Sequence, residues 1–65
     1  MSRLQDIRKE HNLTQGQLAI KSHVPVRTIQ AYEQCYRDIR KANVSTLIKL
    51  ADALGCDIQE LIKED

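Results

Sequence analysis

The chain has 65 residues, of which 42% are hydrophobic and 3% aromatic, and its formal net charge at pH 7 is +1. This length permits one small domain. The sequence has no apolar run that could span a bilayer and no signal-peptide core, so we expect a cytoplasmic protein. With Tyr32 and Tyr36 as its only aromatic residues, it lacks the stacking platforms of single-stranded nucleic-acid binders.

Charge is distributed unevenly along the chain. Residues 20–42 contain five lysines and arginines against two acidic residues, whereas residues 52–65 contain one lysine against five acidic residues. A basic middle and an acidic tail give the protein one face suited to an anionic partner and another turned away from it. Ordinary surface charge is the alternative interpretation.

Two cysteines and two histidines are the candidate metal ligands. Cys35 and Cys56 lack the CxxC spacing of zinc and redox sites. His11 and His23 complete no familiar ligand set with them. We therefore expect reduced structural thiols, as is usual in the cytosol, and neither a metal nor a cofactor.

In chain order, the first two helices are marked by capping boxes. In a capping box, the side chain before the helix accepts the N–H of the residue three positions later, and that residue's side chain accepts the N–H of the first. Ser2 with Gln5 starts the first helix, which is expected to end near His11–Asn12. Thr14 with Gln17 starts the second helix.

A break follows at once, in the four residues from Ser22 to Pro25. A tight turn here needs one left-handed residue, and His23 is of a type tolerated in that region. Pro25 opens a third helix over about residues 25–34, because proline suits a first turn. Two short amphipathic helices joined this way predict a helix-turn-helix, whose second helix lies in the DNA major groove.

The longest connection runs from Cys35 to Asn43 and leads to two more helices. The fourth is predicted from about Val44 to Leu54, with Gly55 as its stop. Asp57 with Glu60 is expected to cap a short fifth helix.

Apolar residues on the inward faces of these helices are the candidates for one core. They are Leu4, Ile7, Leu13, Leu18, Ala19, Val24, Ile29, Tyr32, Leu47, Leu50, Ala51, Leu54, Ile58 and Leu61. Five short helices with hardly any strand place the protein in the all-α class, as a compact bundle.

The outward face of the third helix has the chemistry of base recognition. Arg27, Gln30, Ala31 and Gln34 lie at i, i+3, i+4 and i+7, with no acidic residue among them. Arginine pairs with guanine, glutamine with adenine, and a methyl-bearing side chain with the thymine methyl. A plain solvated face is the alternative. Such a face usually carries Lys and Glu, and this one has neither.

The pattern as a whole resembles a known family. The segments LTQGQLA, V-x-x-x-x-I-x-x-Y-E and TLIKLADALG-C-D-I-x-E-L are similar to the Cro/C1-type helix-turn-helix proteins, also called the XRE family. The resemblance extends from Leu4 to Ile62. It implies a lambda-repressor-like domain of about five helices, a bacterial or phage DNA-binding unit that usually acts as a dimeric repressor.

The resemblance also implies roles for single residues. The base-reading positions fall on Val26, Arg27, Thr28, Gln30 and Ala31. Thr14 and Gln15 are implied to contact a phosphate at the start of the second helix, where anions bind readily, although Thr14 can instead serve only as a cap. Arg8 and Glu33 are implied to form a buried structural ion pair.

Further phosphate contacts are expected beyond the third helix. Gln34 is the last residue on the outward face of the third helix. Arg37, Arg40 and Lys41 lie in the following connection, which is longer than is usual in the family. A loop at this end of the helix would lie near the DNA backbone. A solvated loop is the alternative for its three cations, with Ile39 as the apolar anchor beneath it.

Three residues depart from the family pattern. His23 and Cys35 stand where glycine is usual, and Pro25 stands where Ser or Thr usually caps the third helix. Each departure is expected to cost about 1 kcal/mol if the backbone angles are those of the family. The ends of the third helix are therefore left open.

Two functions from different classes fit the sequence. The favoured one is a transcriptional regulator, a repressor that binds double-stranded DNA as a homodimer on a palindromic operator. A regulatory protein partner is compatible with this function. The other is a protein-interaction module, antitoxin-like or an anti-repressor partner, acting through Ile20, Ile48 and Ile62 if they are exposed. An enzyme is rejected, because no residues form a catalytic set.

Overall fold

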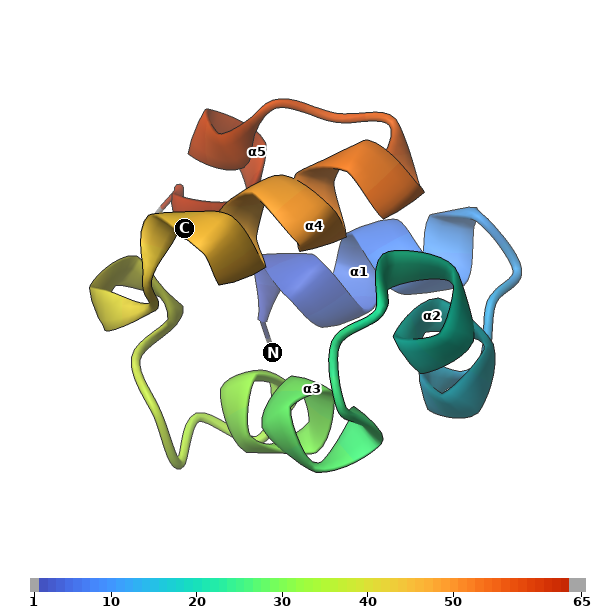
Figure 1. Ribbon diagram of the computed structural model, residues 1–65, viewed down its shortest axis with the longest axis horizontal. Helices are drawn as coiled ribbons and strands as arrows, with labels where there is room; N and C mark the ends of the chain where they lie inside the picture. Colours follow the sequence, from blue (N-terminus) through green and yellow to red (C-terminus); the bar gives the residue numbers. More distant parts are fainter. Residues whose placement is uncertain (1, 64–65) are drawn as a thin grey trace.

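The computed structural model describes residues 2–63 and is helical throughout its regular structure (Figure 1). Its elements are α1 (Arg3–Glu10), α2 (Gln15–Ser22), α3 (Val26–Glu33), the short 3₁₀ helix η1 (Ile39–Lys41), α4 (Val44–Leu54) and α5 (Ile58–Ile62). The all-α class and the five helices predicted from the sequence are confirmed. None of the helices in residues 2–63 is both long and apolar enough to cross a membrane.

Side-chain caps explain where three of the helices begin. Thr14 and Gln17 form the full capping box before α2, with bonds of 3.0 and 2.8 Å. Ser2 Oγ accepts the Gln5 N–H at 3.1 Å. Among the described residues, the Gln5 side chain does not accept the Ser2 N–H, so the predicted capping box is only half formed. Asn43, which was not predicted as a cap, accepts the Thr46 N–H at 2.9 Å and starts α4.

Two of the predicted helix starts are wrong in detail. Asp57 precedes α5 without a side-chain capping bond, because the Glu60 N–H donates instead to the Asp57 backbone carbonyl, at 3.0 Å. The Glu60 side chain, which would complete a capping box, binds Arg3 at 3.0 Å. Pro25 is the N-cap residue of α3, which begins one residue later, at Val26, and ends at Glu33. The third helix is therefore slightly shorter than the predicted span of about 25–34.

The core lies between the helices and contains most of the predicted residues. Those with less than 2% of their surface exposed are Leu4, Leu18, Ile29, Leu50, Leu54 and Leu61. Leu13, Ala19 and Ile58 are only partly buried, at the margin of the core. Ala53 is buried although it was not predicted, because α4 packs against α2 as well as α5 and so buries a wider face.

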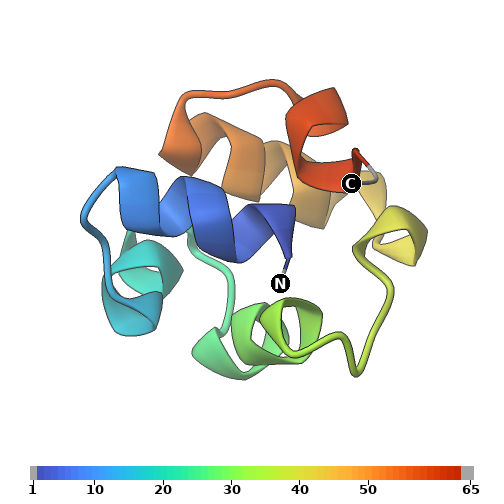
Figure 2. The ribbon, with the colours of Figure 1, turned by 180° about the vertical axis from the view of Figure 1, so that it is seen from behind.

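The packing leaves one side of α3 open. α3 contacts α1 and α2, whereas α5 contacts α1, α4 and η1. Figures 1 and 2 accordingly show α3 at one end of the molecule and α5 at the other. The side of α3 that faces away from α1 and α2 is therefore available to a partner.

Four helix ends are turned by a residue in the left-handed region. These are Asn12, His23, Cys35 and Gly55, with φ between 57° and 63°. His23 and Cys35 adopt the left-handed conformation that glycine usually adopts at these positions in the resembling family. A residue with a Cβ pays about 1–2 kcal/mol there, less for asparagine, whose short polar side chain tolerates the conformation.

Replacing His23 with glycine is expected to stabilise the domain. Relief of the left-handed strain exceeds the extra freedom that glycine gives the unfolded chain, so His23→Gly should raise the free energy of unfolding by about 0.5–1 kcal/mol. Urea denaturation followed by circular dichroism measures it. The matched control is His11→Gly, because His11 has an ordinary φ of −92°; a gain of equal size there would contradict the explanation.

Candidate DNA interface

The turn between α2 and α3 is held from inside. Val24, in the turn, is buried and 3% exposed. Ser22 Oγ donates to the Leu18 carbonyl at 2.7 Å and accepts the Val24 N–H at 3.3 Å. His23 supplies the left-handed residue on the exposed side of the turn. These contacts fix the direction in which α3 leaves the turn.

The two faces of α3 differ sharply. Ile29, Tyr32 and Glu33 are buried. Among the predicted base-reading residues, Val26, Arg27 and Gln30 are exposed, while Thr28 and Ala31 are partly exposed. Gln34, just past the helix, is exposed as well. All six of these side chains therefore reach the surface, and none carries a negative charge.

A buried ion pair ties α1 to the back of α3. Arg8 Nε and Nη2 donate to the two carboxylate oxygens of Glu33 at 2.7 and 2.9 Å. The two side chains are 9% and 1% exposed. Arg8 Nη1 also donates to the Leu13 carbonyl at 2.7 Å, which adds the connection between α1 and α2. The hydrogen bond with Glu33 raises the pKa of Arg8, so the guanidinium stays charged.

Gln15 extends this pair to the outward face of α3. Its Nε2 donates to Glu33 Oε1 at 3.0 Å, and its Oε1 accepts from Gln30 Nε2 at 3.3 Å. A carboxylate only accepts hydrogen bonds, so Gln15 has to turn its amide nitrogen toward Glu33 and its oxygen toward Gln30. Gln30 must then present its own nitrogen to Gln15. The buried charge thus sets the orientation of an amide on the predicted reading face.

This role of Gln15 was missed from the sequence, which implied only a phosphate contact. The signal that could have revealed it is the spacing itself. A long amide at the start of α2 lies within reach of α3 only when a tight turn folds the two helices together. A phosphate contact through the second N–H of its amide stays a prediction.

The start of α2 has the donors that an anion needs. Thr14 caps the helix by accepting the Gln17 N–H. The backbone N–H groups of Gln15 and Gly16 make no hydrogen bond within residues 2–63, as expected for a first helical turn. Together with the positive end of the helix dipole, they fit a phosphate oxygen.

The three cations of the loop after α3 have different surroundings. The Arg40 guanidinium binds Asp38, with Nε–Oδ1 at 3.2 Å and Nη2–Oδ2 at 3.0 Å. Hydrogen bonds from Arg40 lower the pKa of Asp38. The Arg37 guanidinium lies 5.3 Å from the centre of the Tyr32 ring, and Lys41 is exposed. The loop therefore has an orienting acid of its own, which the sequence analysis did not weigh.

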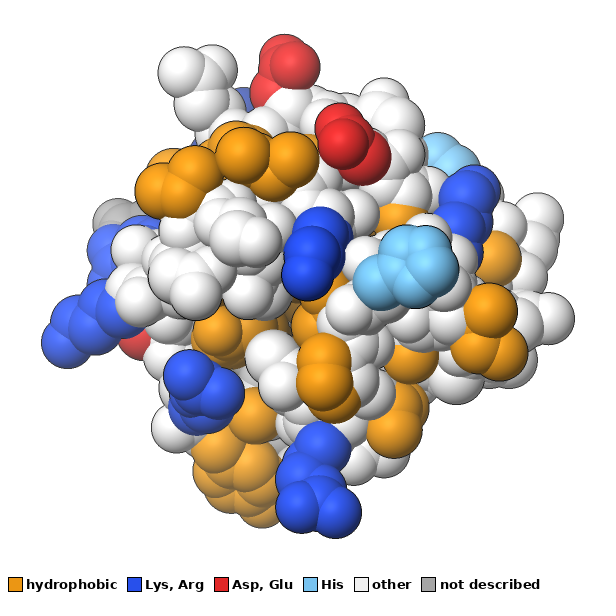
Figure 3. Space-filling model, viewed as in Figure 1, with side chains coloured by type: hydrophobic (Ala, Val, Ile, Leu, Met, Phe, Trp, Pro, Cys, Tyr) orange, Lys and Arg blue, Asp and Glu red, His pale blue; other side chains and the backbone are white. Residues whose placement is uncertain are grey.

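The anchor beneath this loop is Ile39, which is partly buried against the core. It holds the loop beside the end of α3. Figure 3 shows Lys and Arg side chains on and beside α3, and acidic side chains near α5 at the opposite end of the molecule. The uneven charge along the sequence thus becomes an uneven charge across the surface.

The residues that bind metals in other proteins are not gathered here. No group of three or more His, Cys, Asp or Glu within residues 2–63 is arranged to hold a metal ion. Cys35 is exposed and Cys56 is partly buried, and both are free thiols. Burial, followed by the charge of Glu60, raises the pKa of Cys56, so this thiol stays protonated at neutral pH.

Comparison with known proteins agrees with the geometry of α2 and α3. A family model described as helix-turn-helix matches residues 4–61, nearly the whole chain. Searches of curated proteins and of solved structures give no significant match.

The Arg8–Glu33 pair should be the most sensitive point of the fold. Glu33→Gln leaves the Arg8 charge buried without its counter-ion and should lower the free energy of unfolding by about 3–5 kcal/mol. Urea denaturation measures the loss. Arg8→Met combined with Glu33→Leu removes both charges and should cost less than Glu33→Gln alone.

The control is the same exchange at an exposed pair. Glu60→Gln breaks the contact with Arg3, whose partner carboxylate is 46% exposed, and should cost at most about 1 kcal/mol. Equal losses for Glu33→Gln and Glu60→Gln would show that burial of the first pair has no special energetic weight.

Proposed function

Because the chain belongs to the Cro/C1-type (XRE) helix-turn-helix family of DNA-binding proteins, we propose that it is a sequence-specific transcriptional regulator. In this proposal α3 lies in the major groove of double-stranded DNA, and Val26, Arg27, Thr28, Gln30 and Ala31 contact base edges. The protein acts as a repressor by occupying its operator. The family is a regulatory one and is typically not enzymatic.

One observation carries the proposal. The outward face of α3 is free of acidic residues, and the Gln30 amide on it is already held in one orientation by Gln15. Because Gln30 Nε2 is turned toward Gln15, its Oε1 and its second N–H remain for a base. A fixed amide loses less conformational freedom on binding than a mobile one, and adenine is the base whose edge offers both an acceptor and a donor.

The phosphate contacts would flank this reading face on two sides. The free N–H groups at the start of α2 lie on one side, with Thr14 and Gln15. Gln34, Arg37, Arg40 and Lys41 lie on the other. Such contacts position the helix without reading sequence, and the net charge of +1 keeps non-specific binding weak.

A homodimer is part of the proposal. Dimers of this class of protein read two half-sites about one helical turn apart. Exposed apolar side chains suited to an interface are present on α4, where Val44 and Ile48 are 64% and 44% exposed. Ile20 on α2 is 79% exposed. Ile62, the third residue expected on this patch, is instead partly buried against the core. The exposed side chains of Ile20, Val44 and Ile48 are also what favours the second candidate function, a module that binds another protein.

Selection from a pool of random duplex DNA tests the base-reading role of α3. The protein should enrich a palindromic site, and Arg27→Ala should relax one or two base positions at a cost of about 1–3 kcal/mol. Arg3→Ala is the matched control, since Arg3 is paired with Glu60 on α5, and it should leave the enriched sequence unchanged. Failure of the wild type to enrich any sequence would favour the protein-binding alternative.

Salt dependence tests the loop after α3. If Lys41 contacts a phosphate, Lys41→Ala should reduce the slope of log affinity against log salt concentration by about 1 for each bound subunit, and so by about 2 for the dimer. Fluorescence anisotropy on the selected operator gives this slope. Lys63→Ala, beyond the end of α5, should leave it unchanged. Identical slopes for the two variants would place the loop away from the DNA.

A further inference from the structure

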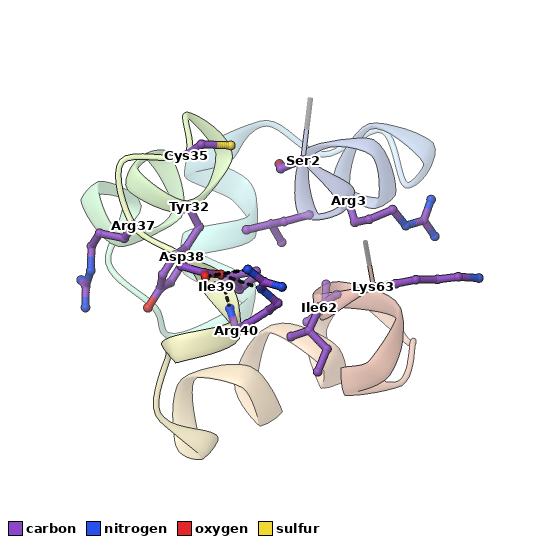
Figure 4. Close-up of a pocket in the computed structure, with 12 residues that line it drawn as sticks. Ser2, Arg3, Tyr32, Cys35, Arg37, Asp38, Ile39, Arg40, Ile62 and Lys63 are labelled. Atoms are coloured by element: carbon purple, nitrogen blue, oxygen red, sulfur yellow. Dashed lines mark hydrogen bonds and ion pairs between the residues drawn. The ribbon is translucent and has the colours of Figure 1, made fainter. Parts of the chain in front are cut away.

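A hollow of about 380 Å³ lies on the side of the molecule where the start of α1, the end of α3 with its loop, and the end of α5 come together (Figure 4). Nothing in the sequence analysis or in the family match assigns a role to it. Its volume lies within the range of small-molecule sites, about 300–1,000 Å³.

The floor of the hollow is apolar. Leu4, Tyr32 and Leu61, which line it, belong to the buried core. Ile39 from η1 and Ile62 from α5 line it as well and are partly buried. A hydrocarbon group in the hollow would cover mainly Ile39 and Ile62, because Leu4 and Leu61 each keep only 1% of their surface exposed. Each Å² of apolar surface removed from water is worth about 25 cal/mol.

The rim of the hollow is basic. It carries the side chains of Arg3, Arg37, Arg40 and Lys63 against the one carboxylate of Asp38. Figure 4 shows Asp38 and Arg40 bonded to each other, with Arg37 extending to one side and Arg3 and Lys63 both extending to the other. Arg40 is bound to Asp38 and Arg3 to Glu60, so the excess positive charge at the rim comes from Arg37 and Lys63, and it favours an anion.

Arg3 adds a second observation. Its Nε is buried and has no hydrogen-bond partner, the single such side-chain atom in the part of the chain that the structure describes. A buried donor without an acceptor costs about 1–3 kcal/mol, so native structures rarely keep one. Arg3 Nη2 is bonded to Glu60, which fixes the guanidinium beside the hollow while its Nε stays unsatisfied.

We propose that this hollow binds a small amphipathic carboxylate, with its hydrocarbon part against Ile39 and Ile62, above the buried floor, and its carboxylate at the Arg3–Lys63 side of the rim. A small inorganic anion would leave the apolar floor uncovered. A hydrophobic cation would meet the basic rim. The site is separate from the outward face of α3, although its rim shares Arg37 and Arg40 with the proposed phosphate contacts. Its test uses no DNA and does not depend on DNA binding.

The test is a titration with octanoate, below the concentration at which it forms micelles, followed by amide chemical shifts in ¹⁵N-labelled protein. Saturable shifts should centre on residues 2–4, 35–40 and 61–63. Octan-1-ol, with the same chain and no charge, should bind about tenfold more weakly, because it lacks a charge-assisted bond. Absence of saturable shifts, shifts centred elsewhere, or equal binding of the alcohol would overturn the proposal.

Two variants with a matched control sharpen the test. Arg3→Gln should weaken octanoate binding about tenfold, and it is expected to fold because its ion pair is partly exposed. Ile39→Asp places a carboxylate beside the ligand and should weaken binding by more. Ile48→Asp, the same exchange on exposed α4, should leave it unchanged. Unaltered binding in Arg3→Gln, or equal loss in Ile48→Asp, would also overturn the proposal, and neither result bears on the proposed regulator function.

Discussion

The arrangement of this domain depends on one buried ion pair. Taking two charges out of water costs several kcal/mol for each ion, and the cost is offset only when the geometry is close and the remaining donors are satisfied. Arg8 and Glu33 meet both conditions, with two parallel bonds to each other and a third from Arg8 to the Leu13 carbonyl. Because these bonds link α1, α3 and the connection after α1, a change in the orientation of α3 would break them, so the pair helps to fix that orientation.

That selection is transmitted outward by hydrogen-bond polarity. Glu33 has only acceptors to offer, so each amide beyond it can be oriented in one way. Gln15 and Gln30 follow in sequence, and the last of them is exposed on the face without acidic residues. A buried structural charge and a surface group are therefore parts of one network. The apolar core determines that α3 packs here, whereas the network determines how its polar groups are presented.

Local patterns predicted most of the fold, and contacts between distant segments limited the rest. The box of Thr14 and Gln17 and the stop at Gly55 are short-range signals, and the structure contains both. The capping box expected at Asp57 is absent: the Glu60 N–H bonds the Asp57 backbone carbonyl, and the Glu60 side chain binds Arg3, 57 residues away in sequence. The second role of Gln15 needs α2 and α3 folded together. The hollow exists only where three segments meet, and a linear pattern does not show how closely they fit.

The one-way order of the amides also bears on how such a protein diverges. A new side chain at position 30 keeps this contact only if it can donate a hydrogen bond to Gln15 Oε1. A glutamate there would place its carboxylate, which only accepts, against that oxygen. Positions 15 and 30 would consequently tend to change together in a lineage that acquires a new recognition sequence. A single exchange at either position would give up this exposed bond to water, so coordinated changes at the two positions would keep the presentation of the recognition amide.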